Sequence, residues 1–192
     1  MTEQQICNIL LKFLSFGKEE ECIKLLKEYP FLLNYPIIMG NTTIFLKACR
    51  HNFQKLIDYL LQQDIDIHHK NGAKENAVHY AVASKHLELV QKLYQLGIAL
   101  NEEDSLKNTP FLKACFSQQF NIMEFLIKQG ADINHMNERG GSIFILIESD
   151  YCEEMFPFAL KHLDKFNEEN QKRLKKIRLK YLVEKGEITN GC

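Results

Sequence analysis

Apolar and polar positions along the chain repeat with a period of 33 residues. Segments 43–49, 76–82 and 109–115 align without a gap, each with an alanine at its sixth position. A second apolar stripe follows in each copy. In the third copy it consists of Ile122 and its neighbours Phe125 and Leu126, at the i, i+3, i+4 spacing of one helix face. Each copy therefore predicts two short helices, and the fixed period predicts a stack of small units that bury their apolar faces against one another.

The third copy gives the clearest helix boundaries. Thr109 is a favourable N-cap residue and Pro110 suits the first helical position, so helices are predicted over 110–116 and about 120–129. Gly130 is expected to end the second helix in the left-handed conformation, and Gly97 to do so one copy earlier. Asp64 stands in place of this glycine in the preceding copy, where a modest conformational cost is expected.

The two ends of the chain carry weaker copies of the pattern. An N-terminal copy is expected over about 5–34, with its second helix at 19–28. Another copy begins at Ser142, and Pro157 in its second stripe predicts a distorted or late-starting helix. A last helix is predicted over about 167–184. Its apolar face is formed by Leu174, Ile177 and Tyr181, with Leu182 beside them.

The third copy resembles the ankyrin repeat. The family signature is a Thr-Pro-Leu-His start, an alanine pair and a Gly-Ala-Asp-Ile-Asn ending, and 109–112, 114–115 and 130–134 match it. The resemblance covers about residues 5–165. It implies an all-α solenoid of paired antiparallel helices with β-turn or hairpin-like loops and a C-terminal capping helix. Departures are leucine in place of the signature histidine at two positions and the loss of an expected glycine from all copies but one. The leucines are Leu46 and Leu112, and the copy that keeps the glycine has it at Gly140.

This organisation predicts a single domain of about five units. The terminal units are expected to be degenerate because one face of each meets water. The expected segments are 5–39 (N-terminal cap repeat), 40–72, 73–105 and 106–138 (internal repeats), 139–165 (degenerate repeat), 166–186 (basic capping helix) and 187–192 (flexible tail).

Composition narrows the possible functions. The chain has 192 residues, 45% of them hydrophobic, and a net charge of −1, which does not favour a general binder of polyanions. Cys49 and Cys115 follow the repeat alanines directly and are expected to be small, buried, free thiols, as in a reducing compartment. No apolar stretch has the length of a membrane span, and the N-terminus lacks a secretion signal. We expect a cytoplasmic protein, in its own cell or in a host.

Catalytic chemistry finds little support in the sequence. The resemblance implies a structural hydrogen-bonding role for His79, and the other histidines lack metal-ligand spacing. The acidic run 102–104 is expected to be a solvated turn. The sequence therefore predicts a non-enzymatic protein with no cofactor, no metal ion and no small-molecule substrate. One alternative stays open, an enzyme site in the C-terminal region around Asp150, Glu153, Glu154 and His162.

The C-terminal helix is dense in basic residues. Six of the nine residues in 172–180 are lysine or arginine. The favoured interpretation is a capping helix with a solvated basic face. The alternatives are that the helix recognises an acidic protein, or that it contacts anionic lipid or nucleic acid. No aromatic residues alternate with the basic ones to stack on bases.

The resemblance places a concave groove along the loop tips and the exposed sides of the first helices. Exposed aromatic side chains there would act as binding anchors, although Phe116 and Tyr80 could instead pack on neighbouring helices. The charges of Arg50, Glu75 and Lys113 would select the partner, together with Arg139. The candidate partner-binding residues are Met39, Thr42, Lys47, Arg50, His51, Glu75, Tyr80, Ser84, Leu106, Asn108, Lys113, Phe116, Ser117, Met136, Arg139, Asp150 and Tyr151.

The functional prediction is a protein-protein interaction module that binds another protein in this groove and is monomeric when free. Little sequence lies outside the repeats, which favours a stand-alone inhibitor, an immunity-type protein, a scaffold or a host-directed bacterial effector. Contact with nucleic acid or a membrane is the less favoured alternative.

Overall fold

The computed structural model describes residues 1–38, 40–148 and 154–184, and in these ranges the regular structure is helical. A single isolated bridge joins Ile38 and Thr42. The elements are α1 (Glu3–Ser15), α2 (Glu19–Glu28), η1 (Pro30–Leu33), α3 (Ile44–His51), α4 (Gln54–Leu60), α5 (Ala77–Ser84), α6 (Leu87–Gln95), α7 (Pro110–Phe116), α8 (Phe120–Lys128), α9 (Ile143–Glu148), α10 (Met155–Lys161), η2 (Leu163–Lys165) and α11 (Glu168–Glu184).

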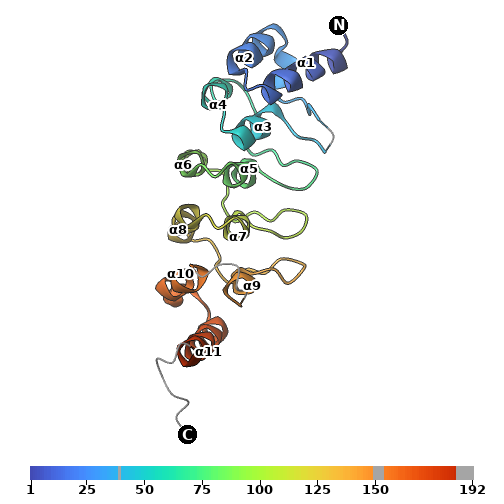
Figure 1. The fold of residues 1–192 in the computed structure, drawn as a ribbon. Helices are drawn as coiled ribbons and strands as arrows, with labels where there is room; N and C mark the ends of the chain where they lie inside the picture. Colours follow the sequence, from blue (N-terminus) through green and yellow to red (C-terminus); the bar gives the residue numbers. More distant parts are fainter. Residues whose placement is uncertain (39, 149–153, 185–192) are drawn as a thin grey trace.

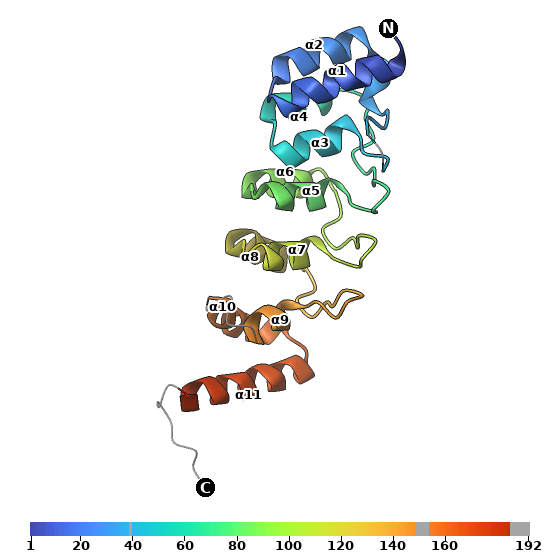
Figure 2. The same cartoon turned by 45° about the vertical axis from the view of Figure 1, so that its right-hand side comes forward.

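The helices form two parallel rows along an elongated stack (Figure 1). The first row contains α1, α3, α5, α7 and α9, and the second contains α2, α4, α6, α8 and α10. Successive first-row helices from α3 to α9 pack directly on one another. Loops project from the first-row side at each level, and α11 lies across the far end (Figure 2). The predicted all-α solenoid is confirmed. Within the described ranges, no helix is long and apolar enough to cross a membrane.

Capping residues and small side chains explain the repeated first helix. The side chains of Thr43, Asn76 and Thr109 each accept a hydrogen bond from the backbone N–H three residues on, which starts the helix. The repeat alanines are fully buried, so neighbouring helices can approach closely. The boundaries predicted for α2 and α7 are confirmed, and α8 ends at Lys128, one residue before its expected end.

The left-handed positions differ in part from those expected. Gly97 and Gly130 have φ of 80° and 86°, as predicted. The expectation for Asp64 is wrong, because its φ is not positive. Helix α4 ends at Leu60, and Ile65 N–H donates to the carbonyl of Gln63, so the chain turns without a left-handed residue at 64.

Several non-glycine residues do adopt the left-handed conformation. Lys74 and Lys107, one period apart, both have φ of 59°, whereas glycine is retained at the next equivalent position, Gly140. The residues that follow α3, α5 and α7 form a second such series. They are Asn52, Lys85 and Gln118. A side chain with a Cβ in this conformation costs roughly 1–2 kcal/mol relative to the right-handed region.

The C-terminal end of the stack is closed by α11. Leu174 is fully buried, and the Arg173 guanidinium pairs with Glu148 while lying 4.5 Å from the centre of the Phe144 ring. Tyr181 is 44% exposed, although its ring contacts Phe156 at 5.7 Å between centroids. These contacts give α11 a capping role on one side and leave most of its basic residues in solvent.

Two further expectations concern Pro157 and the cysteines. Helix α10 begins at Met155, which places Pro157 in its first turn, where no intrahelical donor is needed; the late start is confirmed. Cys49 and Cys115 are free, fully buried thiols, and burial raises the pKa of both well above the ordinary range. Burial likewise raises the pKa of Cys22 to about 12.

Candidate functional site

One side of the first-row helices stays open along three consecutive units. In α3, α5 and α7 the same three register positions retain solvent exposure, whereas the positions between them are buried. The neighbouring first-row helices and the second-row helix of each unit cover the other sides. We call this surface the groove face. Its residues are Lys47, Arg50 and His51 on α3, Tyr80, Ala83 and Ser84 on α5, Lys113 and Phe116 on α7, and Ser117 directly after α7.

Projecting loop tips form one wall beside the groove face. We call the tips 40–42, 71–75, 104–108 and 137–141 the fingers. In the last three, one side chain at the same position organises the turn by accepting two backbone N–H bonds. Backbone bonds also join each finger to the next, at Gly72–Gly40 (2.6 Å), Ser105–Ala73 (2.8 Å) and Glu138–Leu106 (3.2 Å). The organising residues are Asn71, Asp104 and Asn137.

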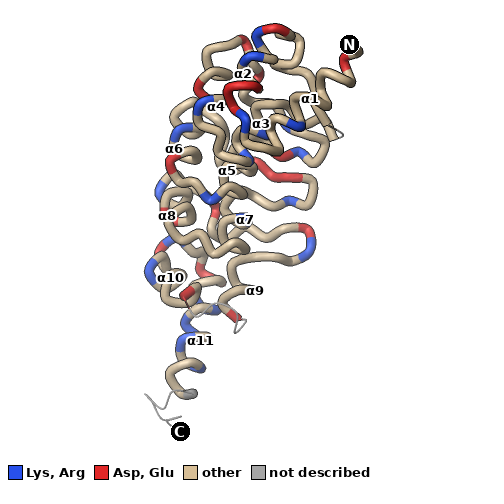
Figure 3. Tube along the Cα trace, turned by 45° about the horizontal axis from the view of Figure 1, so that its top comes forward, with Lys and Arg blue, Asp and Glu red and all other residues tan. Residues whose placement is uncertain are grey.

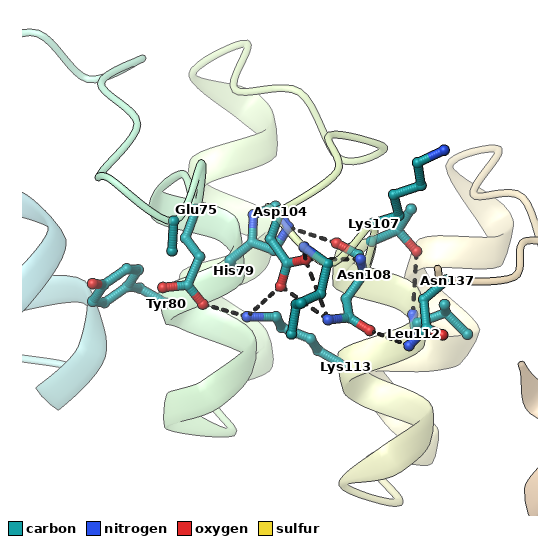
Figure 4. A network of polar contacts seen from close by, with 12 residues as sticks. Glu75, His79, Tyr80, Asp104, Lys107, Asn108, Leu112, Lys113 and Asn137 are labelled. Atoms are coloured by element: carbon teal, nitrogen blue, oxygen red, sulfur yellow. Dashed lines mark hydrogen bonds and ion pairs between the residues drawn. The ribbon is translucent and has the colours of Figure 1, made fainter. Parts of the chain in front are cut away.

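Lys113 joins the groove face to two fingers (Figure 4). Its ammonium group pairs with Glu75 of the preceding unit and lies 3.2 Å from an Asp104 oxygen. Asp104 is only 7% exposed and also accepts hydrogen bonds from the backbone and side chain of Asn108. Burial would raise the pKa of both carboxyl groups, but the hydrogen bonds they accept, including those from Lys113, outweigh it and hold each pKa below its usual range.

His79 lies behind this network and holds two units together. Its Nδ1 accepts from the Asn76 backbone N–H at 3.3 Å, and its Nε2 lies 3.2 Å from the Asn108 carbonyl oxygen. Burial is the main cause that lowers the pKa of His79, with the Lys113 charge adding to it. The imidazole is therefore a buried, neutral connector, which agrees with the structural role implied by the sequence.

Comparison with known proteins supplies the family. The family model described as "Ankyrin repeats (3 copies)" matches residues 47–137. Mouse protein phosphatase 1 regulatory subunit 27 is 33% identical over 114 residues, which is 58% of this chain and 73% of that protein. The chain belongs to the ankyrin repeat proteins. Repeats of this kind are protein-protein interaction modules, and the family is generally non-enzymatic.

Other ankyrin-type matches cover much smaller shares of their proteins. Chicken nuclear factor NF-kappa-B p105 subunit is 23% identical over 134 residues, 61% of this chain and 13% of that protein. Alpha-latrotoxin-Lg1a of Latrodectus geometricus is 33% identical over 89 residues, 45% of this chain and 6% of the toxin. These matches therefore concern the repeats rather than the whole activities of those proteins.

The structure places the predicted groove residues of this ankyrin stack in four groups. Thr42 is 4% exposed at the isolated bridge, so its side chain does not line the surface, contrary to expectation. Exposed members are Arg50, His51, Phe116, Ser117, Met136 and Arg139. Half-buried members are Lys47, Glu75, Tyr80, Ser84, Leu106, Asn108 and Lys113. Outside the described residues are Met39, Asp150 and Tyr151.

Three of these side chains are already engaged within the ankyrin stack. Tyr80 accepts a hydrogen bond at its hydroxyl from the Asn71 side chain at 2.9 Å. Lys113 and Glu75 neutralise each other, so they are not the freely available selecting charges that the sequence suggested. Asp104, expected on a solvated turn, is buried. The 33-residue spacing of Asn71, Asp104 and Asn137 is the signal that could have indicated its role.

The other candidate sites receive less support. The proposed enzyme region includes Asp150 and Glu153, which lie outside the described residues. His162 Nε2 lies 3.0 Å from an oxygen of Glu124 on α8, and Glu154 is exposed. Across the described part of the chain, no group of three or more potential ligands is arranged to hold a metal ion.

Proposed function

We propose that this ankyrin repeat protein binds another protein through the groove face and its fingers, and acts by occupying that partner rather than by chemistry. The observation that carries the proposal is the solvent exposure of Phe116. This phenylalanine remains 42% exposed at a register position where the preceding units have Arg50 and Ala83. An exposed aromatic ring among half-buried polar side chains is typical of a binding anchor.

Features of the surrounding surface support this choice. Leu106 on the finger 104–108 and Met136, which directly precedes the finger 137–141, add apolar area near α7, and Met136 is 60% exposed. The fingers are held by repeated backbone bonds, so a partner meets a largely preformed surface with a small ordering cost. Relatives named as regulatory subunits of protein phosphatase 1 suggest a regulatory form of binding, and we extend that role to this chain as part of the proposal.

Comparative affinity purification tests the proposal. The full chain, a Phe116→Ala variant and a Leu96→Ala variant would each be immobilised and exposed to native lysate, and retained proteins quantified by mass spectrometry. Leu96 is a matched control, because it is 38% exposed but lies at the end of the second-row helix α6.

We expect at least one protein to be retained by the wild type and by Leu96→Ala and lost with Phe116→Ala. The affinity loss should be about 2 kcal/mol, or roughly 30-fold in Kd, with little change in Tm. Equal retention of the same proteins by all three forms would contradict binding through the groove face. A large fall in the Tm of Phe116→Ala would instead show that the ring belongs to the core.

A further inference from the structure

The charges on the two faces of the stack are arranged differently. On the second-row face, ion pairs link successive units. Figure 3 marks the acidic and basic positions along the trace. The pairs are Glu20–Lys55, Asp58–Lys92 and Glu124–Lys161. These pairs neutralise much of the charge between neighbouring units on this face.

The groove face is different. The acidic residues Glu75 and Asp104 on its fingers both form ion pairs with Lys113. The remaining cations form no ion pair within the described residues. They are Lys47 and Arg50 on α3, and Lys74, Lys107 and Arg139 on the fingers. One exposed acid, Glu138, stands beside Arg139. The open charge of this surface is therefore predominantly positive, although the whole chain has a net charge of −1.

Two of these cations stand at strained backbone positions. Lys74 and Lys107 occupy the left-handed conformation that Gly140 occupies in the next finger. A Cβ atom at Gly140 would meet nothing within 4 Å. Lack of space therefore does not explain why this finger has glycine where the two preceding fingers have lysine. The left-handed conformation favours glycine, yet two fingers have lysine there, and neither ammonium group has a described partner. A role of these charges in binding would explain why lysine is present.

The floor of the groove changes character from one unit to the next. Helix α3 presents Lys47 and Arg50, and α7 presents Phe116. Helix α5 presents the small residues Ala83 and Ser84 beside Tyr80, whose hydroxyl is bonded to Asn71 of the finger. Packed helices lie about 8–10 Å apart, so two steps along the row span roughly 20 Å. An extended peptide rises about 3.3 Å per residue, so this distance corresponds to about six residues.

From these observations we infer that the groove takes an acidic, extended protein segment with one large apolar side chain. Its carboxylates lie over α3 and the fingertip lysines, and its apolar side chain packs on Phe116, about six residues away. Between these two contacts the segment passes over the small residues Ala83 and Ser84 of α5. This inference rests on the proposed function, because it specifies the partner of the same surface.

Selection from a random peptide library tests the inference and does not require the natural partner to be identified first. A displayed library of twelve-residue peptides would be presented to the immobilised full chain, and the enriched peptides synthesised. Their binding would be measured by fluorescence anisotropy on the wild type, on Lys47→Glu/Arg50→Glu, on Lys107→Gly, on Phe116→Ala and, for the basic helix α11, on Lys175→Glu/Lys176→Glu. Lys128→Glu, at the exposed end of the second-row helix α8, is the matched charge control.

We expect enriched peptides to combine aspartate or glutamate with a large apolar residue about six positions away. The double charge reversal should weaken binding tenfold or more, and Lys107→Gly by a few-fold, with both effects shrinking at high salt. Lys128→Glu should leave binding unchanged. Thermal denaturation of each variant separates lost binding from lost folding.

The other outcomes distinguish the two proposals. Neutral or basic peptides that still depend on Phe116 would overturn the acidic partner and leave the groove as the binding site. Peptides insensitive to every groove change would overturn both. A library that yields no enriched sequence would overturn the extended segment and leave the groove as a site for a folded protein. Acidic peptides lost only with Lys175→Glu/Lys176→Glu would move recognition to α11, and so would also overturn the inference.

Discussion

Replacing Lys113 with methionine tests whether this lysine holds the stack together. The change keeps much of the side-chain volume and removes the cation shared by Glu75 and Asp104. Asp104 would keep its bonds from the Leu106 and Asn108 backbone and the Asn108 side chain, whereas Glu75 would keep one bond from Asn71 at 3.1 Å. A hydrogen bond to a charged group contributes about 1.5–3 kcal/mol. Because Asp104 stays well satisfied, we expect a net loss of about 2 kcal/mol.

Urea denaturation at neutral pH measures this loss. Lys47→Met is the matched control, since Lys47 has the equivalent register position on α3 and forms no ion pair with a described residue; it should change stability by less than about 0.5 kcal/mol. A Glu75→Gln cycle should reveal a coupling of about 1 kcal/mol. If Lys113→Met is no more destabilising than Lys47→Met, the network is a surface feature without structural weight.

The same variant has a defined pH dependence. The lowered pKa values of Glu75 and Asp104 contribute stability above their unfolded values and lose it as pH falls through the folded ones. Lys113→Met removes the lysine's share of that contribution. The difference from wild type should therefore be full at pH 7, begin to shrink near pH 4 as the unfolded carboxylates take up protons, and vanish only below the lowered pKa values of the folded state. A difference that persists unchanged into acid would point to lost packing instead.

Three further changes address other parts of the stack. Ala81→Asp should unfold the protein, because it places an unpaired charge where exposure is now 0%, and far-UV circular dichroism would show it; a folded variant refutes the packing. Lys107→Gly should raise stability by roughly 0.5 kcal/mol in urea, as relief of the left-handed lysine exceeds the entropy lost to glycine. The lowered pKa of His79 means that the unfolded chain takes up a proton first, so stability should fall as pH drops below about 6.5. His79→Leu should flatten that fall between pH 7.5 and 5.5, and an unchanged slope would assign it to other groups.

Local sequence signals were sufficient to predict where these helices begin. Thr109 and Pro110 mark the start of α7 through capping chemistry that acts within one turn, and the structure begins the helix there. Pro157 likewise predicted the late start of α10. These features depend on residues a few positions apart, which a single sequence displays directly.

Features that arise only when the units stack on one another could not be predicted from the sequence in the same way. Glu75 and Lys113 are 38 residues apart, and nothing in either segment indicates that one neutralises the other. The turn at Asp64 depends on how α4 ends, which decides whether a left-handed residue is needed at all. The exposure of Phe116 depends on how neighbouring units pack, because an aromatic residue at that register fits a core as well as a surface. The partner-binding roles themselves remain proposals.

The backbone links between successive fingers have a mechanical consequence. Among the described residues each finger is bonded to the neighbouring fingers, so tension applied at the two ends would be carried by all the inter-unit junctions in series, and the junctions would give way one at a time. Releasing 33 residues would lengthen the chain by about 100 Å, given roughly 3.5 Å per extended residue and a folded spacing near 10 Å. Pulled in this way, the protein would extend in a series of similar steps, and a ligand bridging three levels would merge those steps into one larger event.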